Sequence, residues 1–177
     1  FYPGKNLGAY GDAGAIVTND QALAIKCKKI ANHGRLSKFD HEFEGRNSRL
    51  DGIQASILSV KLKYLDKFTD LRNENALKYN DLLSNISSVI LPVKSNNVKH
   101  SYHLFVIRVP KRDFVRIELK KHNIDTGIHY PISLPKLKAY SYLDCKIDQF
   151  IACKIESDLL SLPIHEMLLS SEIDFVC

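Results

Sequence analysis

The spacing of apolar and polar residues near the start of the chain predicts a strand and then a helix. The β-branched run at 15–18 is typical of a short buried strand. Asp20 offers an N-cap for a helix over about 21–32, and Gly34 follows as a stop signal. Residues 35–49 are polar and rich in charge, which predicts an irregular surface loop.

A long helical region follows. Asp51 is an N-cap candidate for an amphipathic helix over about 52–68, where apolar residues recur at helical spacing. A second helical stretch continues to about residue 83. Residues 84–97 are rich in Ser and Asn and mark the expected join to a second part of the chain.

The second part reads as an α+β unit. Its clearest strand covers 102–109 and ends at Pro110. A helix at about 113–122, a strand at about 126–130 and a helix at about 148–158 complete the pattern. The predicted organisation is therefore a strand-plus-helices portion at 1–80 and a smaller α+β domain at 98–177.

Composition narrows the classes of function. The 177 residues are 45% hydrophobic and 25% charged, which is ordinary globular composition. The net charge of +5 favours anionic ligands but is too diffuse to indicate nucleic-acid binding. The longest apolar runs fall far short of the roughly 20 residues that span a bilayer, so neither a nucleic acid nor a membrane is an expected partner.

The cysteines form no CxxC pair and no metal-ligand spacing, and the histidines show no HxxxH or HxH pattern. We therefore expect free thiols in a reducing, cytoplasmic compartment, and no metal site. The cysteines are Cys27, Cys145, Cys153 and Cys177. The chain begins at Phe1 and ends within an amphipathic stretch at 172–176, so we expect either a processed piece or a fragment of something longer.

Lys5 is the most suggestive residue. It lies in a glycine-dense segment, 3–14, just before the predicted strand, where a restrained backbone holds it close to whatever docks there. The amine could cradle a phosphate or act as a Schiff-base nucleophile, and it could also be a solvated turn lysine. A P-loop is excluded, because Asn6 stands where Ser or Thr should follow the lysine.

Two further groups carry candidate chemistry. Asn47 and Arg49 lie at the start of the long helix, where an amide and a guanidinium make a plausible phosphate clamp. His129 and Tyr130 end the predicted strand, and both side chains can bind sugar hydroxyls or relay protons. Each group also has a structural reading, in which it packs or caps its element.

Taken together, these segments resemble the DegT/DnrJ-type nucleotide-sugar aminotransferases, pyridoxal-phosphate enzymes of the aspartate-aminotransferase fold class. The order and separation of the motifs match the family over almost the whole chain. They are Phe1-Tyr2-Pro3-Gly4-Lys5-Asn6-Leu7-Gly8 with Gly11-Asp12-Ala13-Gly14-Ala15, Asn47-Ser48-Arg49-Leu50-Asp51 with Gln54-Ala55, Gly127-Ile128-His129-Tyr130-Pro131, and Leu160-Ser161-Leu162-Pro163.

The resemblance implies an α/β fold, with the end of a large cofactor-binding domain followed by a small α+β domain. It implies that Lys5 bonds covalently to pyridoxal 5'-phosphate and moves the proton during transfer. Asn47 corresponds to the residue that reaches the cofactor phosphate of the neighbouring subunit, so a homodimer with shared active sites is implied. Arg49, His129 and Tyr130 match positions that meet the nucleotide-sugar substrate.

The implied reaction transfers an amino group from an amino acid, usually glutamate, to a keto-sugar nucleotide for surface polysaccharide. The stretches 32–35 and 39–42 look closest to members that act on 3-keto-6-deoxyhexoses, so 3-amination is expected over 4-amination. Two departures stand out: Ala13 replaces a usual glycine, and 133–135 lacks a usual histidine, which bears on sugar specificity. Other cofactor contacts of the family lie before the lysine, so the isolated 177 residues are expected to be inactive.

Two alternatives stay open. The chain could be a basic, non-catalytic α+β binding module, or an inactive piece of such an enzyme, with Lys5 only a solvated lysine. Some relatives dehydrate nucleotide sugars with a histidine in place of the lysine, and Lys5 argues against that chemistry because an imidazole cannot form the same bond.

Overall fold

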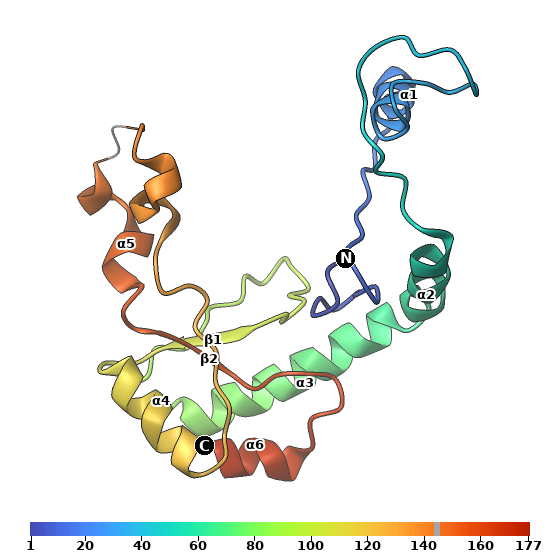
Figure 1. Cartoon of the computed structure of the whole chain (residues 1–177). Helices are drawn as coiled ribbons and strands as arrows, with labels where there is room; N and C mark the ends of the chain where they lie inside the picture. Colours follow the sequence, from blue (N-terminus) through green and yellow to red (C-terminus); the bar gives the residue numbers. More distant parts are fainter. Residues whose placement is uncertain (144–145) are drawn as a thin grey trace. The chain divides into compact units, whose positions relative to one another are not determined.

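The computed structural model describes residues 1–143 and 146–177, which divide into two compact units, Phe1–Leu65 and Asp66–Cys177 (Figure 1). Among these residues Cys27, Cys153 and Cys177 are free thiols, while Cys145 lies outside the described residues. The predicted domains, 1–80 and 98–177, place the division further along the chain and stay a prediction.

The first unit contains helix α1 (Gln21–Ile30) with both of its predicted end signals. The side chain of Asp20 accepts a hydrogen bond from the Leu23 amide at 3.0 Å, so this residue is the N-cap. Gly34 has a φ of +78°, and its amide donates to the Lys29 carbonyl at 2.8 Å. A left-handed glycine that satisfies a late helical carbonyl stops the helix, as predicted.

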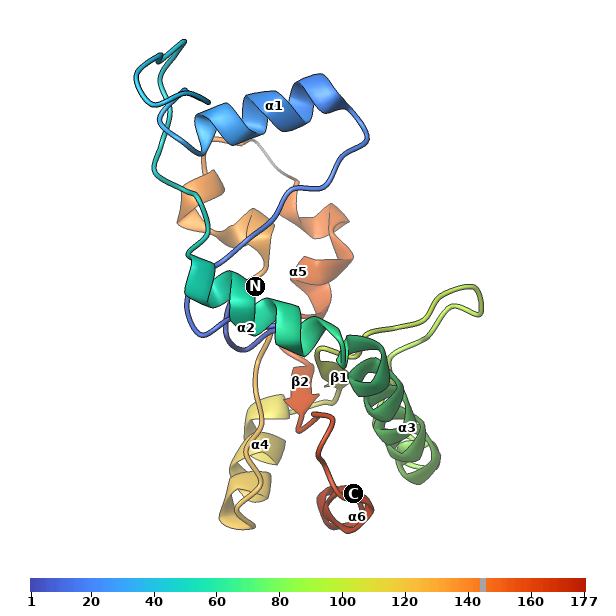
Figure 2. The same cartoon turned by 90° about the vertical axis from the view of Figure 1, so that its right-hand side faces the viewer.

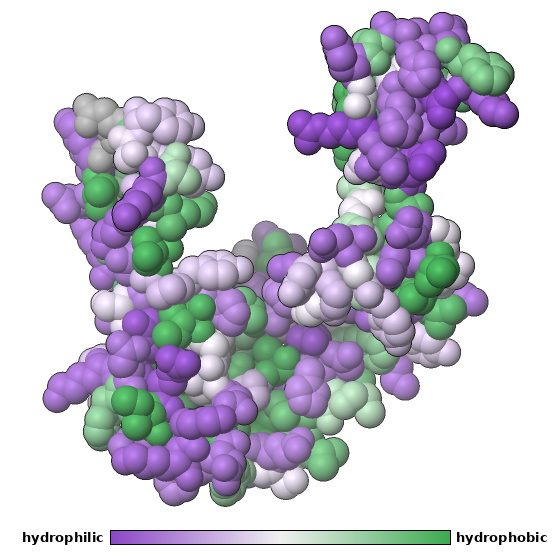
Figure 3. Space-filling model, in the orientation of Figure 1, coloured by the Kyte–Doolittle hydropathy of each residue, from purple (hydrophilic) through white to green (hydrophobic). Residues whose placement is uncertain are grey.

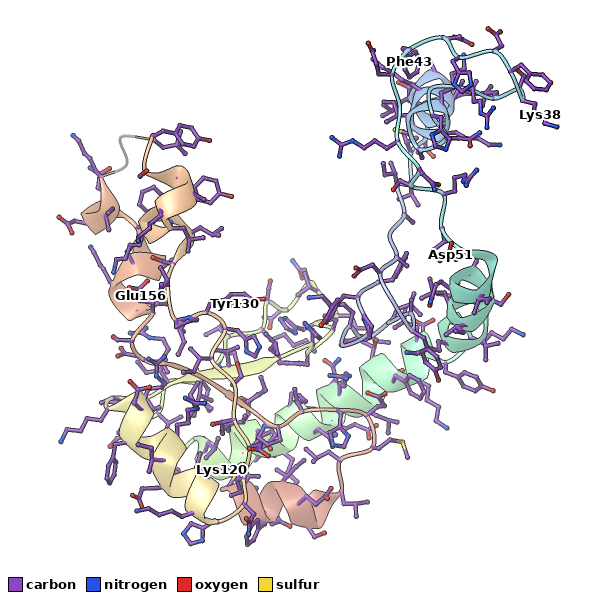
Figure 4. All side chains as sticks on the ribbon, in the orientation of Figure 1. Lys38, Phe43, Asp51, Lys120, Tyr130 and Glu156 are labelled. Carbon is purple, nitrogen blue, oxygen red and sulfur yellow. The ribbon has the colours of Figure 1, made fainter. Side chains whose placement is uncertain are left out.

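The long helical region is two helices, α2 (Gly52–Leu62) and α3 (Leu65–Leu83), so the predicted helix over 52–68 breaks earlier than expected. The break falls at 63–64, where neither Gly nor Pro marks it. Asp51 precedes α2 in an extended conformation but makes no side-chain cap bond (Figure 4). The N-cap position is therefore confirmed and the capping hydrogen bond is not formed.

The strand predicted at 15–18 is wrong for the described residues. These residues have no strand partner, and Ile16 and Val17 are 72% and 93% exposed. A strand exists only where a second strand accepts its backbone hydrogen bonds, and a β-branched run cannot show whether that second strand is present. Ile16 and Val17 therefore lie on the surface of the described structure as exposed apolar side chains.

The second unit is built on an antiparallel pair of strands, β1 (Phe105–Arg108) and β2 (Leu159–Leu162). The register sets Phe105 opposite Leu162 and Ile107 opposite Leu160, so one face of the pair is wholly apolar. Side chains alternate along a strand, so Ser161 lies on the opposite face.

Three helices cover the apolar face: α3, α4 (Arg112–Lys121) and α6 (Ser170–Val176), gathered on one side of the strands in Figures 1 and 2. Tyr79 on α3 stacks on Phe105 with ring centroids 4.9 Å apart, and both side chains are fully buried. Ile173 of α6 is buried in the same core. The core explains why α4 and the strand within 102–109 appear where the pattern predicted them.

The strand predicted at 126–130 is also wrong, because only Gly127 pairs, in an isolated bridge with Ser161. The helix predicted over 148–158 is shorter and divided, with the 3-10 turn η3 (Ile147–Gln149) followed by α5 (Ile151–Ile155). Two further 3-10 turns, η1 (Leu134–Lys136) and η2 (Lys138–Tyr140), precede them.

The surface of α1 and the segment that follows it is mainly hydrophilic in Figure 3. This agrees with the polar loop predicted over 35–49, in which the described residues form no helix and no strand beyond one isolated bridge.

Candidate active site

Lys5 lies on a tight turn with its side chain exposed. Its amide donates to the Tyr2 carbonyl at 2.9 Å, which closes the turn. The turn folds back so closely that a Cβ on Gly8 would lie 2.3 Å from the Pro3 carbonyl oxygen. Only glycine fits there, so Gly8 permits the tight turn that carries Lys5.

Helix α2 anchors this turn from far along the chain. The Tyr10 amide donates to Gln54 Oε1 at 2.7 Å, and Lys61 Nζ donates to the Gly8 carbonyl at 2.6 Å. A backbone held by hydrogen bonds at two points is pre-organised, and pre-organisation is what a covalent or binding lysine requires. Gln54 belongs to the second sequence motif, whereas nothing in the sequence singled out Lys61.

Asn47 and Arg49 are exposed on the segment that leads into α2. Asn47 pairs with Asn32 in an isolated antiparallel bridge, and the Ser48 amide donates to the Ala31 carbonyl at 2.9 Å. Leu50 has a φ of +62°, a conformation that non-glycine residues rarely adopt. The end of α1 therefore holds the backbone of this segment while its side chains stay available.

Asn47 and Arg49 line a hollow of about 1100 Å³ in the first unit, together with residues 12–18 and one face of α1. Lys5 does not line this hollow. Within one chain the structure thus brings Asn47 and Arg49 together and leaves Lys5 at a different place in the unit.

His129 and Tyr130 belong to the second unit. His129 Nδ1 lies 2.8 Å from Ser161 Oγ, and the two rings meet edge to face with centroids 5.4 Å apart. The peptide bond between them is cis. Tyr130 is 67% exposed and His129 is half-buried, so both side chains can meet a ligand.

The segment after Tyr130 is tied to the residues following α5. Glu156 accepts from the Ser133 amide at 2.7 Å and pairs with Lys136 (Figure 4 labels Glu156 and Tyr130). The hydrogen bonds from Lys136 and Ser133 lower the pKa of the Glu156 carboxyl to about 2, so it is ionised at neutral pH. Nothing in the sequence distinguished Glu156 from other surface carboxylates.

In the part of the chain that the structure describes, no three His, Cys, Asp or Glu side chains gather as metal ligands. No helix among these residues is both long enough and apolar enough to cross a bilayer.

Solved structures share the fold of this chain over almost its whole length and so define its class. The chain superposes on DesV of S. venezuelae, in complex with a ketimine intermediate, with a TM-score of 0.94, 36% identity and coverage of 99% of this chain and 48% of that one. It also matches NtdA of Bacillus subtilis with bound cofactor PMP, with a TM-score of 0.84, 30% identity and coverage of 99% and 42%. The predicted α/β fold of pyridoxal-phosphate-dependent transferases is confirmed.

The whole chain, residues 1–177, matches the DegT/DnrJ/EryC1/StrS aminotransferase family, and it belongs to that family. It is 44% identical to the dTDP-3-amino-3,6-dideoxy-alpha-D-galactopyranose transaminase of Aneurinibacillus thermoaerophilus, over 99% of this chain and 52% of that protein. It is 41% identical to the pleiotropic regulatory protein of Geobacillus stearothermophilus, over 99% of this chain and 48% of that protein. It is 36% identical to the UDP-2-acetamido-2-deoxy-3-oxo-D-glucuronate aminotransferase of Pseudomonas aeruginosa, over 100% of this chain and 48% of that protein.

The chain spans about half the length of the curated relatives it matches. The predicted family is confirmed, and pyridoxal phosphate is confirmed as the cofactor of that family, since a similar solved structure holds PMP. The residues of this chain fit that cofactor: Lys5 supplies an exposed amine on a locked turn, and Asn47 supplies an exposed amide that can donate to phosphate oxygens.

Proposed function

We propose that the protein transfers an amino group from an amino acid, glutamate being the expected donor, to the keto carbon of a nucleotide-linked sugar. The supporting observation is the turn of Lys5, which is closed by the hydrogen bond from the Lys5 amide to the Tyr2 carbonyl. Its flanking backbone is held by Lys61 and Gln54, in a chain that belongs to an aminotransferase family over its whole length. The product would be an amino-deoxy sugar for surface polysaccharide. The cytoplasmic location predicted from the cysteines stays a prediction.

The role of each residue follows from its chemistry and placement. Bound pyridoxal phosphate supplies an electron sink that stabilises negative charge on the α-carbon of the amino donor. Lys5 would hold the cofactor and then carry the proton, because a released amine on a locked turn stays within reach of the reacting carbons. Asn47 would donate its amide to the cofactor phosphate of the partner subunit.

Substrate recognition would fall to three other side chains. Arg49 is an exposed guanidinium that can pair with a diphosphate oxygen in a bidentate manner. His129 and Tyr130 present an imidazole and a phenol that can bind sugar hydroxyls. Since the relatives include a transaminase named for a 3-amino sugar, we propose a 3-keto sugar as acceptor, carried by a nucleoside diphosphate.

The first experiment tests the covalent role of Lys5. Complete wild-type protein mixed with pyridoxal phosphate should absorb in the visible, and borohydride should fix the cofactor on the peptide that contains Lys5. Lys5→Ala should lose both the absorbance and the label, whereas the matched variant Lys26→Ala, on the exposed surface of α1, should keep both. A visible band that survives in Lys5→Ala would refute the enzyme proposal.

A second experiment tests the shared site. If each site takes Lys5 from one subunit and Asn47 from the other, mixing Lys5→Ala with Asn47→Ala subunits gives mixed dimers with one intact site of two. Random mixing should then restore about a quarter of the wild-type activity, although each variant alone is inactive or weak. No recovery, with mixed dimers shown to form by native mass spectrometry, would place both residues in one subunit or remove Asn47 from the site.

Two finer points have their own tests. A panel of keto-sugar nucleotides, with product analysis, decides the position of amination, and turnover of 4-keto but not 3-keto sugars would overturn the 3-keto proposal. We also propose that residues 1–177 alone are inactive, and expressing this piece with pyridoxal phosphate and looking for the visible band tests that.

A further inference from the structure

The imidazole of His129 is held by two neighbours, Ser161 of the fourth motif and Gly127 of its own motif. Its Nδ1 lies 2.8 Å from Ser161 Oγ. Ser161 is only 4% exposed and is fixed in β2, where it pairs with Val106 on one side and with Gly127 on the other. A buried hydroxyl requires a hydrogen-bond partner, and here that partner is the ring of a half-buried histidine.

The second neighbour, Gly127, has no side chain, and this leaves the space that the imidazole occupies. A Cβ on Gly127 would lie 2.6 Å from His129 Cε1 and 3.2 Å from Nδ1, and the third nearest atom, at 3.6 Å, is Nε2 of the same ring. The ring therefore lies directly over the glycine, in space that any other residue would occupy. The Gly127 amide and carbonyl bond to Ser161 at 3.0 and 2.8 Å, so the glycine and the serine form one rigid seat for the imidazole.

The seat faces away from the core. The neighbours of Ser161 in β2, Leu160 and Leu162, point into the apolar core, so the Ser161 side chain points to the opposite face of the strand pair. A ring seated on that face has Nδ1 turned toward the protein. Its other nitrogen, Nε2, is the one left for a ligand.

We propose that Ser161 and Gly127 are positioning residues for His129, and that the Ser161 hydroxyl donates to Nδ1, which places the imidazole proton on Nε2. His129 then presents an N–H donor of fixed direction, which suits the hydroxyl or phosphate oxygens of a nucleotide sugar. The part of this inference that concerns substrate rests on the proposed function. The part that concerns the ring does not.

The test begins with the ring itself, in the complete protein without substrate. Nitrogen-15 NMR of the histidine side chains should show His129 with a proton on Nε2 and none on Nδ1. Ser161→Ala should give a mixture of tautomers, and Ser161→Thr, which keeps the hydroxyl, should restore the single form. His165, whose Nδ1 accepts from the Met167 amide, serves as an internal control that should not change.

Gly127→Ala provides a second route, because the added methyl meets the imidazole and no backbone atom among its three nearest neighbours. The ring should be displaced while the fold is kept, and the His129 signals should shift as in Ser161→Ala. Wild-type protein with the proton on Nδ1, or His129 signals unchanged in both Ser161→Ala and Gly127→Ala, would overturn the inference.

Kinetics separate this inference from the proposed function. Ser161→Ala should raise the KM for the keto-sugar nucleotide about fivefold, the loss of one hydrogen bond of about 1 kcal/mol, and leave kcat within about twofold. The exposed variant Ser157→Ala is the matched control and should change neither. If the NMR signature changes as predicted and KM does not, the seat is confirmed and the substrate role proposed for His129 is the part that fails.

Discussion

Replacing Arg72 of α3 tests how the second unit is held together. Arg72 is 8% exposed, and its guanidinium donates to Glu166 Oε2 at 2.9 and 3.1 Å. It also donates to the Tyr102 and Ile164 carbonyls at 3.0 and 3.2 Å. One side chain therefore joins α3 to the segments just before β1 and just after β2.

The expected cost of Arg72→Ala follows from these contacts. The substitution leaves the Glu166 carboxylate without its charge partner and two carbonyls without a donor. Breaking a largely buried pair by removing one partner costs about 3–5 kcal/mol, much of it the penalty for the groups left behind. Arg72→Lys keeps the charge but not the planar fork, so its cost should be smaller, about 1–3 kcal/mol.

Native-state hydrogen exchange in the complete protein measures the cost of Arg72→Ala separately for each part of the structure. In Arg72→Ala the free energy of opening should fall by about 3–5 kcal/mol for peptides covering β1 and β2, whereas peptides covering α1 should be unchanged. The matched control is Lys120→Ala, whose pair with Asp125 is 65% and 84% exposed, and it should cost less than about 1 kcal/mol. If Arg72→Ala costs no more than Lys120→Ala, the guanidinium does not hold the unit together.

Three further changes have defined outcomes. Gly8→Ala forces a methyl against backbone and should weaken cofactor retention about tenfold, whereas Gly52→Ala, with no atom within 4 Å of its added Cβ, should not, as measured by the visible absorbance of bound cofactor. Tyr79→Phe removes a 2.9 Å hydrogen bond to the Pro163 carbonyl and should cost about 1 kcal/mol in urea unfolding. Because burial raises the pKa of Tyr79, the wild-type stability should fall as pH rises above about 10, and the Phe variant should lose less. The carboxyl of Glu156 should titrate in carbon-13 NMR with a midpoint near 2. Its contribution to stability should be complete above pH 4.5 and lost as the pH falls toward 2. A midpoint above 4 would contradict the hydrogen bonds from Ser133 and Lys136.

Local signals in the sequence were sufficient for most helices. Asp20 and Gly34 bound α1 because a cap and a left-handed glycine act within one turn of the helix. The apolar spacing that predicted α4 is satisfied in the core. The break between α2 and α3 could not be predicted, because no residue at 63–64 carries a stop signal.

The strand predictions were wrong where a strand depends on a neighbouring strand to pair with. Residues 15–18 and 126–130 have the β-branched or alternating composition of strands, yet the first has no pairing partner among the described residues and the second pairs only at Gly127. Composition reports how well a side chain fits a pleated surface and says nothing about whether a ladder forms beside it. The strand within 102–109 succeeded because β2 lies beside it.

The candidate site was predictable as a set of motifs but not as a set of contacts. The resemblance named Lys5, Asn47, Arg49, His129 and Tyr130, and their roles stay predictions. The residues that hold them lie far along the chain: Gln54 is 44 residues from Tyr10, Lys61 is 53 from Gly8, and Ser161 is 32 from His129. No local pattern can indicate such pairings.

These contacts give a physical reason why the four motifs occur together. The first motif is closed by Gln54 of the second, through the Tyr10 amide and the space above Gly11. The third is seated on Ser161 of the fourth, through the Gly127 backbone and the His129 ring. In each pair one segment thus holds the geometry of the other, within a single unit: Gln54 holds the first motif and Ser161 holds the third. A change in a fixing segment should therefore mimic a change in its partner, so Gln54→Ala should impair cofactor retention as Gly8→Ala does, and Ser161→Ala should impair substrate binding as a change at His129 does.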